Sequence, residues 1–370
     1  MNTLSTNLIQ DAKIVIALGS GGVGKTTSSL GIALAAAYQG KKVCLLSIDP
    51  AKRLAAALGI KLGSELSTVQ LPNNTKNGSL DAAMLDQKAV FDEMVGKFTS
   101  DLVTYKKILD HPIYQAASEK FGGALEYMAV AKLQKIVDED QFDLIVLDTP
   151  PDTHALEFLS KPNILAGFME NKVMTWLIKP IYFAQKLGLG KLAAMGERLA
   201  GGIAKVTGVK SLHLLAELLV LMQDTIEGFH KSSERITEIL HYDSTKFLLV
   251  TALHTASHRS TLHILKEISE RNFQIDLVLI NRTIPDAAKD SIAKLPLFYP
   301  NTDEANPLLS ALYNKHLTSE QIKEALVSKL QTQANKHIAF ADFPERTYPL
   351  QNIEELSRFA TELSLTQTHK

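Results

Sequence analysis

Cysteine is nearly absent from this 370-residue sequence, which contains only Cys44. A single cysteine cannot form a disulfide within the chain, and it excludes the Cys-x-x-Cys pairs that hold many structural zinc ions. Long apolar runs are also missing. No stretch reaches the roughly 18 apolar residues that a transmembrane helix needs. The segment Met1 to Ala12 lacks the basic-then-apolar pattern of a secretory signal. We therefore expect a cytoplasmic protein without an integral membrane segment.

An excess of charge of either sign is missing too. The 39 Lys and Arg residues nearly balance the 40 Asp and Glu residues, which gives a formal net charge of -1. Net charge therefore offers no reason to expect nucleic acid or an anionic membrane as the main partner. The 45% of hydrophobic residues and 21% of charged residues are typical of an ordinary globular protein with a large core.

Short apolar runs recur along the chain between longer helical patterns, which indicates parallel strands buried on both faces. We expect central strands at Ile14–Leu18, Val43–Ile48, Leu144–Leu147, Phe247–Thr251 and Leu277–Ile280, with weaker candidates at Leu80–Met84 and His337–Phe340. The stretches 86–140 and 160–240 predict helices without strands between them. The fold class is therefore α/β, a doubly wound and mostly parallel sheet with an inserted α-helical subdomain.

We expect the whole chain, 1–370, to form one domain. Its sheet-containing core covers about 12–85, 141–160 and 245–365, and the helical subdomain covers about 86–140 and 160–240. The tail after Leu363 is expected to be frayed.

The pattern Gly-x-x-x-x-Gly-Lys-Thr spans Gly19 to Thr26, between the first predicted strand and a predicted helix over Lys25–Tyr38. Glycines let backbone N–H groups turn towards a phosphate, and the positive end of the following helix adds to the attraction. In such a loop the lysine reaches the β- and γ-phosphates and the Thr hydroxyl ligates Mg²⁺. The alternative is an ordinary glycine-rich turn, but the strand before and the helix after favour ATP and Mg²⁺ as cofactors.

Two aspartates follow predicted strands elsewhere in the sequence. Asp148 ends the apolar run that begins at Leu144, and Asp49 follows the second strand directly. Both are expected at the carboxyl edge of the sheet, where ligands of such folds bind. A hydrolase of this kind needs a carboxylate associated with magnesium and a group that orients the attacking water. Taken alone, each aspartate would be read as a turn or helix cap.

These motifs resemble the ArsA/Get3 ATPases, which carry a deviant P-loop. The loop from Gly21 to Thr27 is similar to theirs, Ser47–Ala51 looks like their switch I, and Asp148–Leu156 looks like their switch II. Asn281 resembles their adenine-recognising position, and Phe343–Leu350 resembles the late loop that closes over the base. The motifs run in the family's order over nearly the whole chain.

The resemblance implies a role for each matched residue. Asp49 would orient the attacking water, and Lys25 would hold the phosphates. Thr26 would ligate Mg²⁺, and Asp148 would contact the metal through a water molecule. The residues that would hold the nucleotide are Gly21, Gly22, Val23, Gly24, Lys25, Thr26, Thr27, Asn281 and Pro344. Family members act as homodimers, or as two halves in one chain, and convert hydrolysis into work on a membrane-associated partner or hydrophobic client.

The sequence departs from the family at Ser20, where a signature lysine usually reaches the partner's phosphates. Lys52 and Arg53 are the nearest candidates to replace it, although solvated charges at a helix start are an equal explanation. One cysteine cannot form an arsenite site of several thiols, a zinc clamp between subunits or an iron–sulfur cluster. Cys44, inside an apolar strand, is expected to be a buried small hydrophobe.

Other functions remain open from the sequence. A ParA/MinD-type positioning ATPase shares the deviant loop, a nucleotide-gated binding protein would hydrolyse little, and a metabolic ligase or kinase would need a further substrate pocket. The Met- and Leu-rich stretch of residues 160–225 is read as core or as an exposed client groove. His254 and His258 have a helical spacing that could bind a metal ion, but no Cys or carboxylate accompanies them locally, which favours helix-surface or nucleotide-edge positions.

Overall fold

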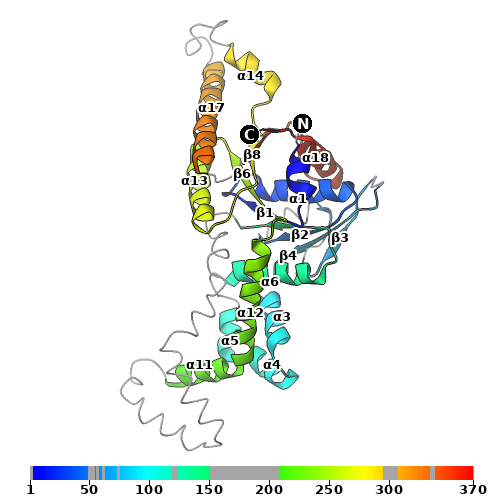
Figure 1. Ribbon diagram of the computed structural model, residues 1–370, viewed down its shortest axis with the longest axis vertical. Coiled ribbons are helices and arrows are strands. Elements are labelled where there is room, and N and C mark those ends of the chain that lie inside the picture. Colours follow the sequence, from blue (N-terminus) through cyan, green and yellow to red (C-terminus); the bar gives the residue numbers. More distant parts are fainter. Residues whose placement is uncertain are drawn as a thin grey trace, which may run out of the picture. The chain divides into compact units, whose positions relative to one another are not determined.

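A computed structural model describes residues 3–48, 55, 58–60, 63–72, 76–118, 124–150, 209–294, 307–333 and 338–369. The chain divides into two compact units (Figure 1). Unit 1 spans Met1–Leu85, Lys135–Ser160 and Leu240–Lys370, and unit 2 spans Asp86–Gln134 and Lys161–Ile239. Among the described helices, none combines the length and apolar character that a membrane crossing requires.

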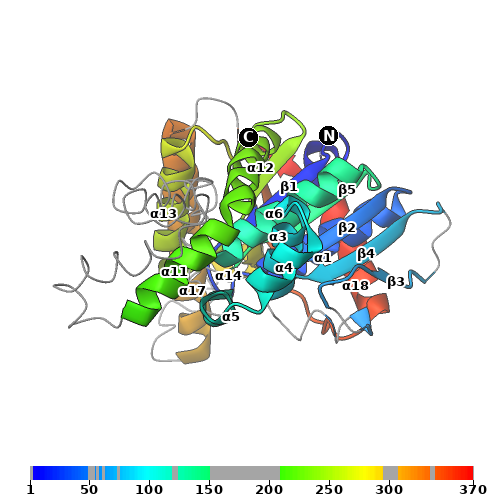
Figure 2. The same cartoon turned by 90° about the horizontal axis from the view of Figure 1, so that it is seen from below.

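Within the described residues, nine strands of unit 1 form one sheet in the order β3-β4-β2-β5-β1-β6-β7-β8-β9. Figure 2 shows β5, β2, β4 and β3 following one another across it. Neighbours pair in parallel except at the edges, where β3 and β9 are antiparallel to β4 and β8. The strands are β1 (Ile14–Leu18), β2 (Lys42–Ser47), β3 (Ser67–Val69), β4 (Ser79–Met84), β5 (Leu144–Asp148), β6 (Thr245–Ala252), β7 (Leu277–Thr283), β8 (Ala339–Pro344) and β9 (Thr368–His369).

The central strands are buried along their whole length, which is why they read as continuous apolar runs. All five residues of β1 and all five of β5 are inaccessible to solvent. Side chains of a strand alternate between the two faces, so complete burial means that both faces are covered. On one face, Val15 and Ala17 join a hydrophobic core with helix α1 (Lys25–Tyr38) and helix α18 (Ile353–Leu365).

Helix α18 packs its apolar face against α1. Phe359 and Leu363 lie against Gly31, where only a hydrogen atom fits between the helices. The Tyr38 hydroxyl lies 2.8 Å from that of Ser357 and adds a polar link. The helix that follows the glycine loop is thereby held between the sheet and a second helix.

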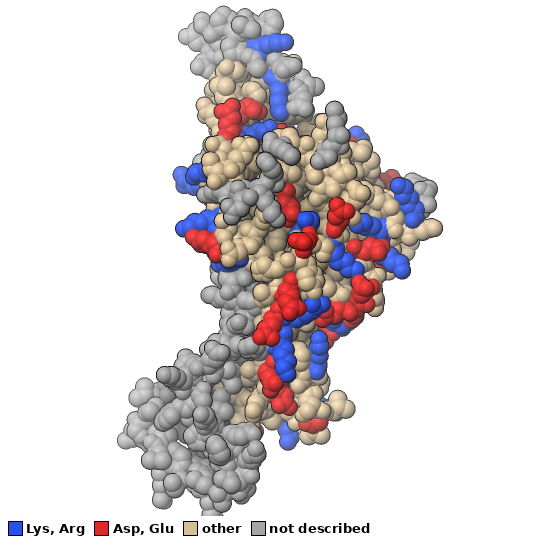
Figure 3. Space-filling model, viewed as in Figure 1, with Lys and Arg blue, Asp and Glu red and all other residues tan. Residues whose placement is uncertain are grey.

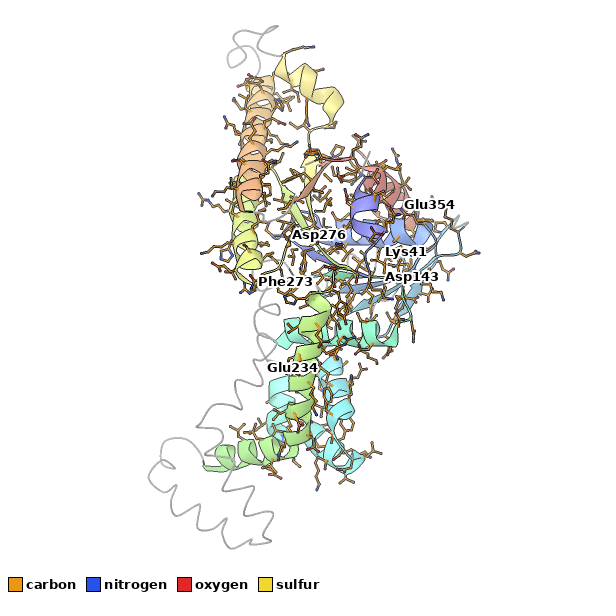
Figure 4. All side chains as sticks on the ribbon, viewed as in Figure 1. Lys41, Asp143, Glu234, Phe273, Asp276 and Glu354 are labelled. Atoms are coloured by element: carbon orange, nitrogen blue, oxygen red, sulfur yellow. The ribbon has the colours of Figure 1, made fainter. Side chains whose placement is uncertain are left out.

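Two aspartates fix the amino edge of the sheet (Figure 4). Asp143 precedes β5 and accepts a hydrogen bond from the Lys42 N–H at 2.7 Å, at the start of β2. Asp276 precedes β7, accepts from the Phe247 N–H at 2.9 Å and pairs with the Lys246 ammonium at 3.2 Å. Each carboxylate therefore ties the start of its own strand to a neighbour and sets their register.

The other described helices of unit 1 are the π-helix η1 (Ser5–Ile9), α13 (Thr255–Glu270), α14 (Asp286–Ala293) and α17 (Pro307–Gln333). His254 is the N-cap of α13 and its ring accepts from the Ser257 N–H at 3.2 Å. This is a structural role for the first of the two histidines that the sequence singled out.

The described elements of unit 2 are helices, as the sequence pattern predicts. They are α3 (Gln87–Phe98), α4 (Leu102–Leu109), α5 (Pro112–Ser118), α11 (Val209–Leu221) and α12 (Gln223–Leu240), with α6 (Ala124–Glu139) shared with unit 1. Phe91 stacks on Tyr114 at 5.4 Å and on Phe229 at 5.8 Å. The Tyr114 hydroxyl donates to Asp92 at 2.6 Å, and burial raises the pKa of this phenol far above its usual range.

The α/β fold, the parallel central strands and the helix Lys25–Tyr38 are confirmed. Burial of Cys44 in β2 is confirmed as well. The frayed tail was wrong, because α18 runs to Leu365 and β9 then pairs with β8. The last expected strand, His337–Phe340, was placed too early, since β8 runs from Ala339 to Pro344. The short edge strands β3 and β9 were missed because so few residues carry no periodic signal.

Replacing Gly31 with alanine should destabilise unit 1, although alanine favours a helix by about 1 kcal/mol over glycine. The added Cβ would lie 2.3 Å from Phe359 Cε1 and 2.9 Å from Leu363 Cδ2. Such overpacking costs about 1–3 kcal/mol, and each kcal/mol lowers the thermal unfolding midpoint by roughly 2–4 °C. Gly63→Ala is the matched control, because no atom lies within 4 Å of its added Cβ. A midpoint that rises in Gly31→Ala would contradict this packing, and Phe359→Leu in that background should restore part of the loss.

Candidate functional site

The glycine loop leaves β1 at the carboxyl edge of the sheet and packs directly on strand β6. A Cβ added to Gly19 would lie 2.4 Å from the Val250 carbonyl oxygen, so no side chain fits there. Gly22 and Gly24 have φ values of +80° and +95°, in the region that glycine adopts without strain. Gly19 is therefore needed because the loop packs closely on β6, and Gly22 and Gly24 are needed because of their backbone conformation.

Helix α1 begins where the loop ends, with Gly24 as its N-cap in a left-handed conformation. The first N–H groups of a helix have no partner within it, and its dipole favours an anion at this end. Lys25 is buried, while Thr26 and Thr27 are half-buried. The predicted phosphate-binding residues are therefore consecutive from the loop into the first turn of α1.

Asp148, the last residue of β5, is fully buried beside the loop. It pairs in register with Ala17 of β1 and with Ser47 of β2. The Ser47 hydroxyl donates to Asp148 Oδ2 at 3.1 Å. The Ser29 hydroxyl lies 3.4 Å from Oδ1, but it also lies 3.0 Å from the Lys25 carbonyl oxygen. The shorter distance makes Ser47 the stronger of the two donors to this carboxylate.

The chain on either side of Asp148 is also tied to its neighbours. The Asp148 carbonyl oxygen accepts from the Ile48 N–H at 2.9 Å, and the Thr149 hydroxyl donates to the Ala17 carbonyl at 2.7 Å. The ends of β1, β2 and β5 are therefore cross-linked at one edge, where the strand order changes direction around β1. Ligands of open α/β sheets bind at such a switch point.

Asn281, the predicted adenine-binding residue, lies next to the loop. It is 9% exposed, and its side-chain amide donates to the Val23 carbonyl oxygen at 2.8 Å. Pro344, predicted on the same grounds, pairs with Thr283 at the end of β8. The structure brings Asn281 to the loop, while adenine binding by either residue remains a prediction.

The late loop that begins at Phe343 is held by a buried arginine. The Arg346 guanidinium lies between the rings of Phe343 and Phe359, at 3.8 and 4.0 Å, and contacts Glu362 at 3.3 Å. Burial lowers the pKa of Arg346, and the opposing pull of Glu362 is the weaker effect. The Tyr348 hydroxyl donates to the same carboxylate at 2.7 Å. The loop is thereby fastened to α18, which packs against α1.

The residue at which the glycine loop differs from the family's pattern is buried. Ser20, which stands where the resemblance expects a lysine, is 7% exposed. Asp49, Lys52 and Arg53 lie outside the described residues, as does the switch-like segment from 151 onward. Their predicted roles are therefore not tested by the geometry.

Sequence analysis missed two hydroxyl groups of this site. Ser47 was part of the switch I pattern but had no role, and Ser29 was not considered. A signal was present, because Ser29 lies one helical turn after Lys25 and Ser47 pairs with Asp148 in the expected strand register. Only the order of the strands in the sheet shows that both hydroxyls approach one carboxylate.

A glycine loop between β1 and α1, with a buried aspartate on the adjacent strand, defines the class of P-loop nucleoside triphosphatases. The sequence model of one such family, described as anion-transporting ATPase, matches residues 12–296. The chain belongs to this ArsA/Get3 family and is an ATP-binding ATPase.

Individual relatives are distant. An ATPase ASNA1 homolog from Paramecium tetraurelia is 27% identical over 278 residues, which cover 75% of this chain and 77% of the relative. The ATPase get3 of Schizosaccharomyces japonicus is 25% identical over 285 residues, with 76% and 78% covered. The ATPase GET3 of Kluyveromyces lactis is 26% identical over 276 residues, with 72% and 70% covered.

Removing the Ser47 hydroxyl should slow ATP hydrolysis more than removing the Ser29 hydroxyl. Hydrogen bonds to charged groups contribute about 1.5–3 kcal/mol, so we expect Ser47→Ala to lower steady-state turnover by about tenfold or more. Ser29→Ala, which loses mainly a bond to its own helix, is the matched control and should lose less than about threefold. Equal effects, or a larger effect of Ser29→Ala, would show that Ser47 does not orient the carboxylate.

Proposed function

We propose that this ATPase is a homodimeric switch in which Mg-ATP controls the capture of an apolar segment from a membrane-associated protein. The observation that carries this proposal is a cavity of about 830 Å³ in unit 2. Its apolar lining comes from α11 and from the starts of α4 and α5, and consists of Leu102, Val103, Pro112, Leu214, Val220 and Leu221. The cavity lies in helices that the sheet does not need for its own core.

Two of these side chains are unusually open to solvent. Leu102 is 77% exposed and Val103 is 64% exposed. Apolar surface gains about 25 cal/mol for each Å² removed from water, so an apolar segment that covers both residues is stabilised there. Contiguous exposed apolar surface of this kind is typical of protein-binding sites.

Polar groups around the cavity favour a helical client. Lys106, Lys107, Asp110 and Glu217 line it together with the apolar residues. His111 also lines it, and its Nδ1 accepts from the Ile113 N–H at 3.3 Å. In the neutral ring Nε2 then carries the proton, and it is buried without a partner among the described residues. An apolar helix seated in a groove, with a free carbonyl oxygen of its last turn facing this donor, fits these groups.

The site in unit 1 fits Mg-ATP by its shape and its donors. A glycine-rich loop leads into the N-terminal N–H groups of α1, and a buried carboxylate lies on the adjacent strand β5. Lys25 would contact the phosphates, Thr26 would ligate Mg²⁺, and Asp148 would hold a water of the metal's shell. Asp49 would orient the attacking water. The metal supplies charge neutralisation between the phosphates.

Several observations favour this function over a positioning ATPase. The apolar face of α18 (Leu356, Phe359, Ala360 and Leu363) is buried against the core, so it is not available to a membrane. On the face shown in Figure 3, Lys and Arg alternate with Asp and Glu over the described residues, without a continuous basic surface. We therefore expect a protein client in the cytoplasm rather than DNA or lipid.

Asp49→Asn should separate binding from hydrolysis. The amide keeps the size of the side chain but cannot accept the water's proton, so ATP should bind and turnover should fall by about 100-fold or more. Solution mass with Mg-ATP should shift from monomer to dimer in the native protein and stay dimeric for longer in the variant. If the native protein binds ATP without turnover or dimerisation, the chain is a nucleotide-gated binding protein and Ser20 marks the lost function.

Leu102→Asp should abolish capture of an apolar helix by this cavity. A charge in the lining would lose its hydration when the helix covers it. The probe is a fluorescent 20-residue Leu/Ala peptide, delivered from detergent in the presence of Mg-ATP. Leu308→Asp is the matched control, because Leu308 of α17 is 78% exposed and lies in the other unit. Basal ATP turnover should be unchanged in both variants; equal capture by both would exclude the cavity as the binding site.

A further inference from the structure

Strand β7 is interrupted by a bulge next to the glycine loop. Its pairing with β8 shifts register between Asn281 and Thr283, and Arg282 between them has a φ of +58°. A left-handed conformation at a residue other than glycine costs about 1 kcal/mol or more. It persists because the surrounding strands hold it, and strained backbone of this kind gathers at functional sites.

The bulge fixes the orientation of the Asn281 side chain. The Arg282 N–H donates to Asn281 Oδ1 at 3.0 Å. This hydrogen bond fixes the direction of Oδ1, and because the carboxamide is planar it also fixes the direction of Nδ2. Nδ2 donates to the Val23 carbonyl oxygen at 2.8 Å, across 258 residues of sequence.

A side chain at Gly24 would displace the Asn281 amide from this contact. A Cβ added to Gly24 would lie 2.3 Å from Asn281 Nδ2. The φ of +95° at the same residue also favours glycine. Gly24 therefore meets two requirements, the turn of the loop and the close approach of a side chain from β7.

The hydrogen bond to Val23 also determines where the next N–H group points. A peptide unit is planar and trans, so its C=O and N–H point in opposite directions. The carbonyl of Val23 and the N–H of Gly24 belong to one such unit. When Asn281 holds the Val23 carbonyl towards β7, the Gly24 N–H is directed away from β7. In loops of this class it is these backbone N–H groups that bind phosphate oxygens.

We propose that Asn281 is a positioning residue for the phosphate loop. Its carboxamide fixes the peptide between Val23 and Gly24, so that the Gly24 N–H is oriented for phosphate before any nucleotide binds. This role is separate from recognition of adenine. It rests on the phosphate binding assigned to the loop under the proposed function.

A ligand without a base separates the two roles. Mg-tripolyphosphate offers phosphates to the loop and nothing to an adenine site, so we would measure its affinity and that of Mg-ATP by calorimetry. One buried hydrogen bond corresponds to about a five- to tenfold change in affinity. We expect Asn281→Ala to weaken both ligands by about that factor. Asn281→Asp should weaken both further, because a carboxylate of the same shape repels the Val23 carbonyl.

Hydrogen exchange of the nucleotide-free protein tests the contact itself. Amides in peptides that cover residues 19–25 should exchange about five- to tenfold faster in Asn281→Ala. Arg282→Gly is the matched control, because it keeps the N–H that orients Asn281 and suits the left-handed conformation. Exchange in the loop should be unchanged in this variant.

Three results are decisive. If Asn281→Ala weakens ATP but leaves tripolyphosphate affinity and loop exchange unchanged, Asn281 contacts only the base and the proposal is overturned. If the native protein binds neither ligand, the proposed nucleotide site fails, and the exchange comparison still decides the role of Asn281. Faster loop exchange in Asn281→Ala, with Arg282→Gly unchanged, supports the proposal in either case.

Discussion

The close approach of the loop Gly19–Gly24 to strands β6 and β7 is the constraint on which the rest of the site depends. Gly19 leaves no space above the Val250 carbonyl, and Gly24 leaves none beside Asn281. Because the loop packs this tightly on two strands, its position at the start of the following helix is fixed. The first turn of α1 therefore presents its N–H groups from a fixed position, as binding of a highly charged ligand requires.

The buried carboxylate of Asp148 is the second constraint. An ionised group removed from water is costly unless hydrogen bonds replace its hydration. Ser47 supplies such a bond at 3.1 Å, and Ser29 lies close to the other oxygen at 3.4 Å. Because these hydroxyls come from β2 and α1, the carboxylate can hold its place only when strands β1, β2 and β5 and helix α1 are assembled. Folding and the positioning of this carboxylate are thus the same event.

The two units differ in the kind of surface they offer. Unit 1 is a sheet buried on both faces, with polar groups gathered at its carboxyl edge. Unit 2 has an aromatic core around Phe91 and Phe229, yet leaves Leu102 and Val103 open to solvent. Hydrophobic side chains at the start of a well-capped helix are not needed for that helix to form, since Asp101 already caps it. Folding of this helix therefore does not account for their exposure, which is the basis of the proposed client site.

Much of the fold of this protein, and the family to which it belongs, could be predicted from its sequence alone. Local patterns were sufficient for the central strands, for the helix Lys25–Tyr38 and for the glycine loop, because each depends on neighbouring residues and on a periodicity of two or 3.6. The order of motifs was also sufficient to identify the family. The short strands β3 and β9 were not predictable, since two or three residues become a strand only when an existing sheet edge pairs with them.

The tertiary structure alone decided the contacts between residues that lie far apart in the chain. The sequence places Ser47 and Asp148 at the ends of two strands, but their hydrogen bond depends on β2 and β5 being neighbours. Likewise, the sequence predicts Asn281 as a nucleotide-site residue, while its bond to Val23 depends on the bulge at Arg282. Such contacts cannot be read from the sequence, because sheet order and a strained backbone are properties of the assembled fold.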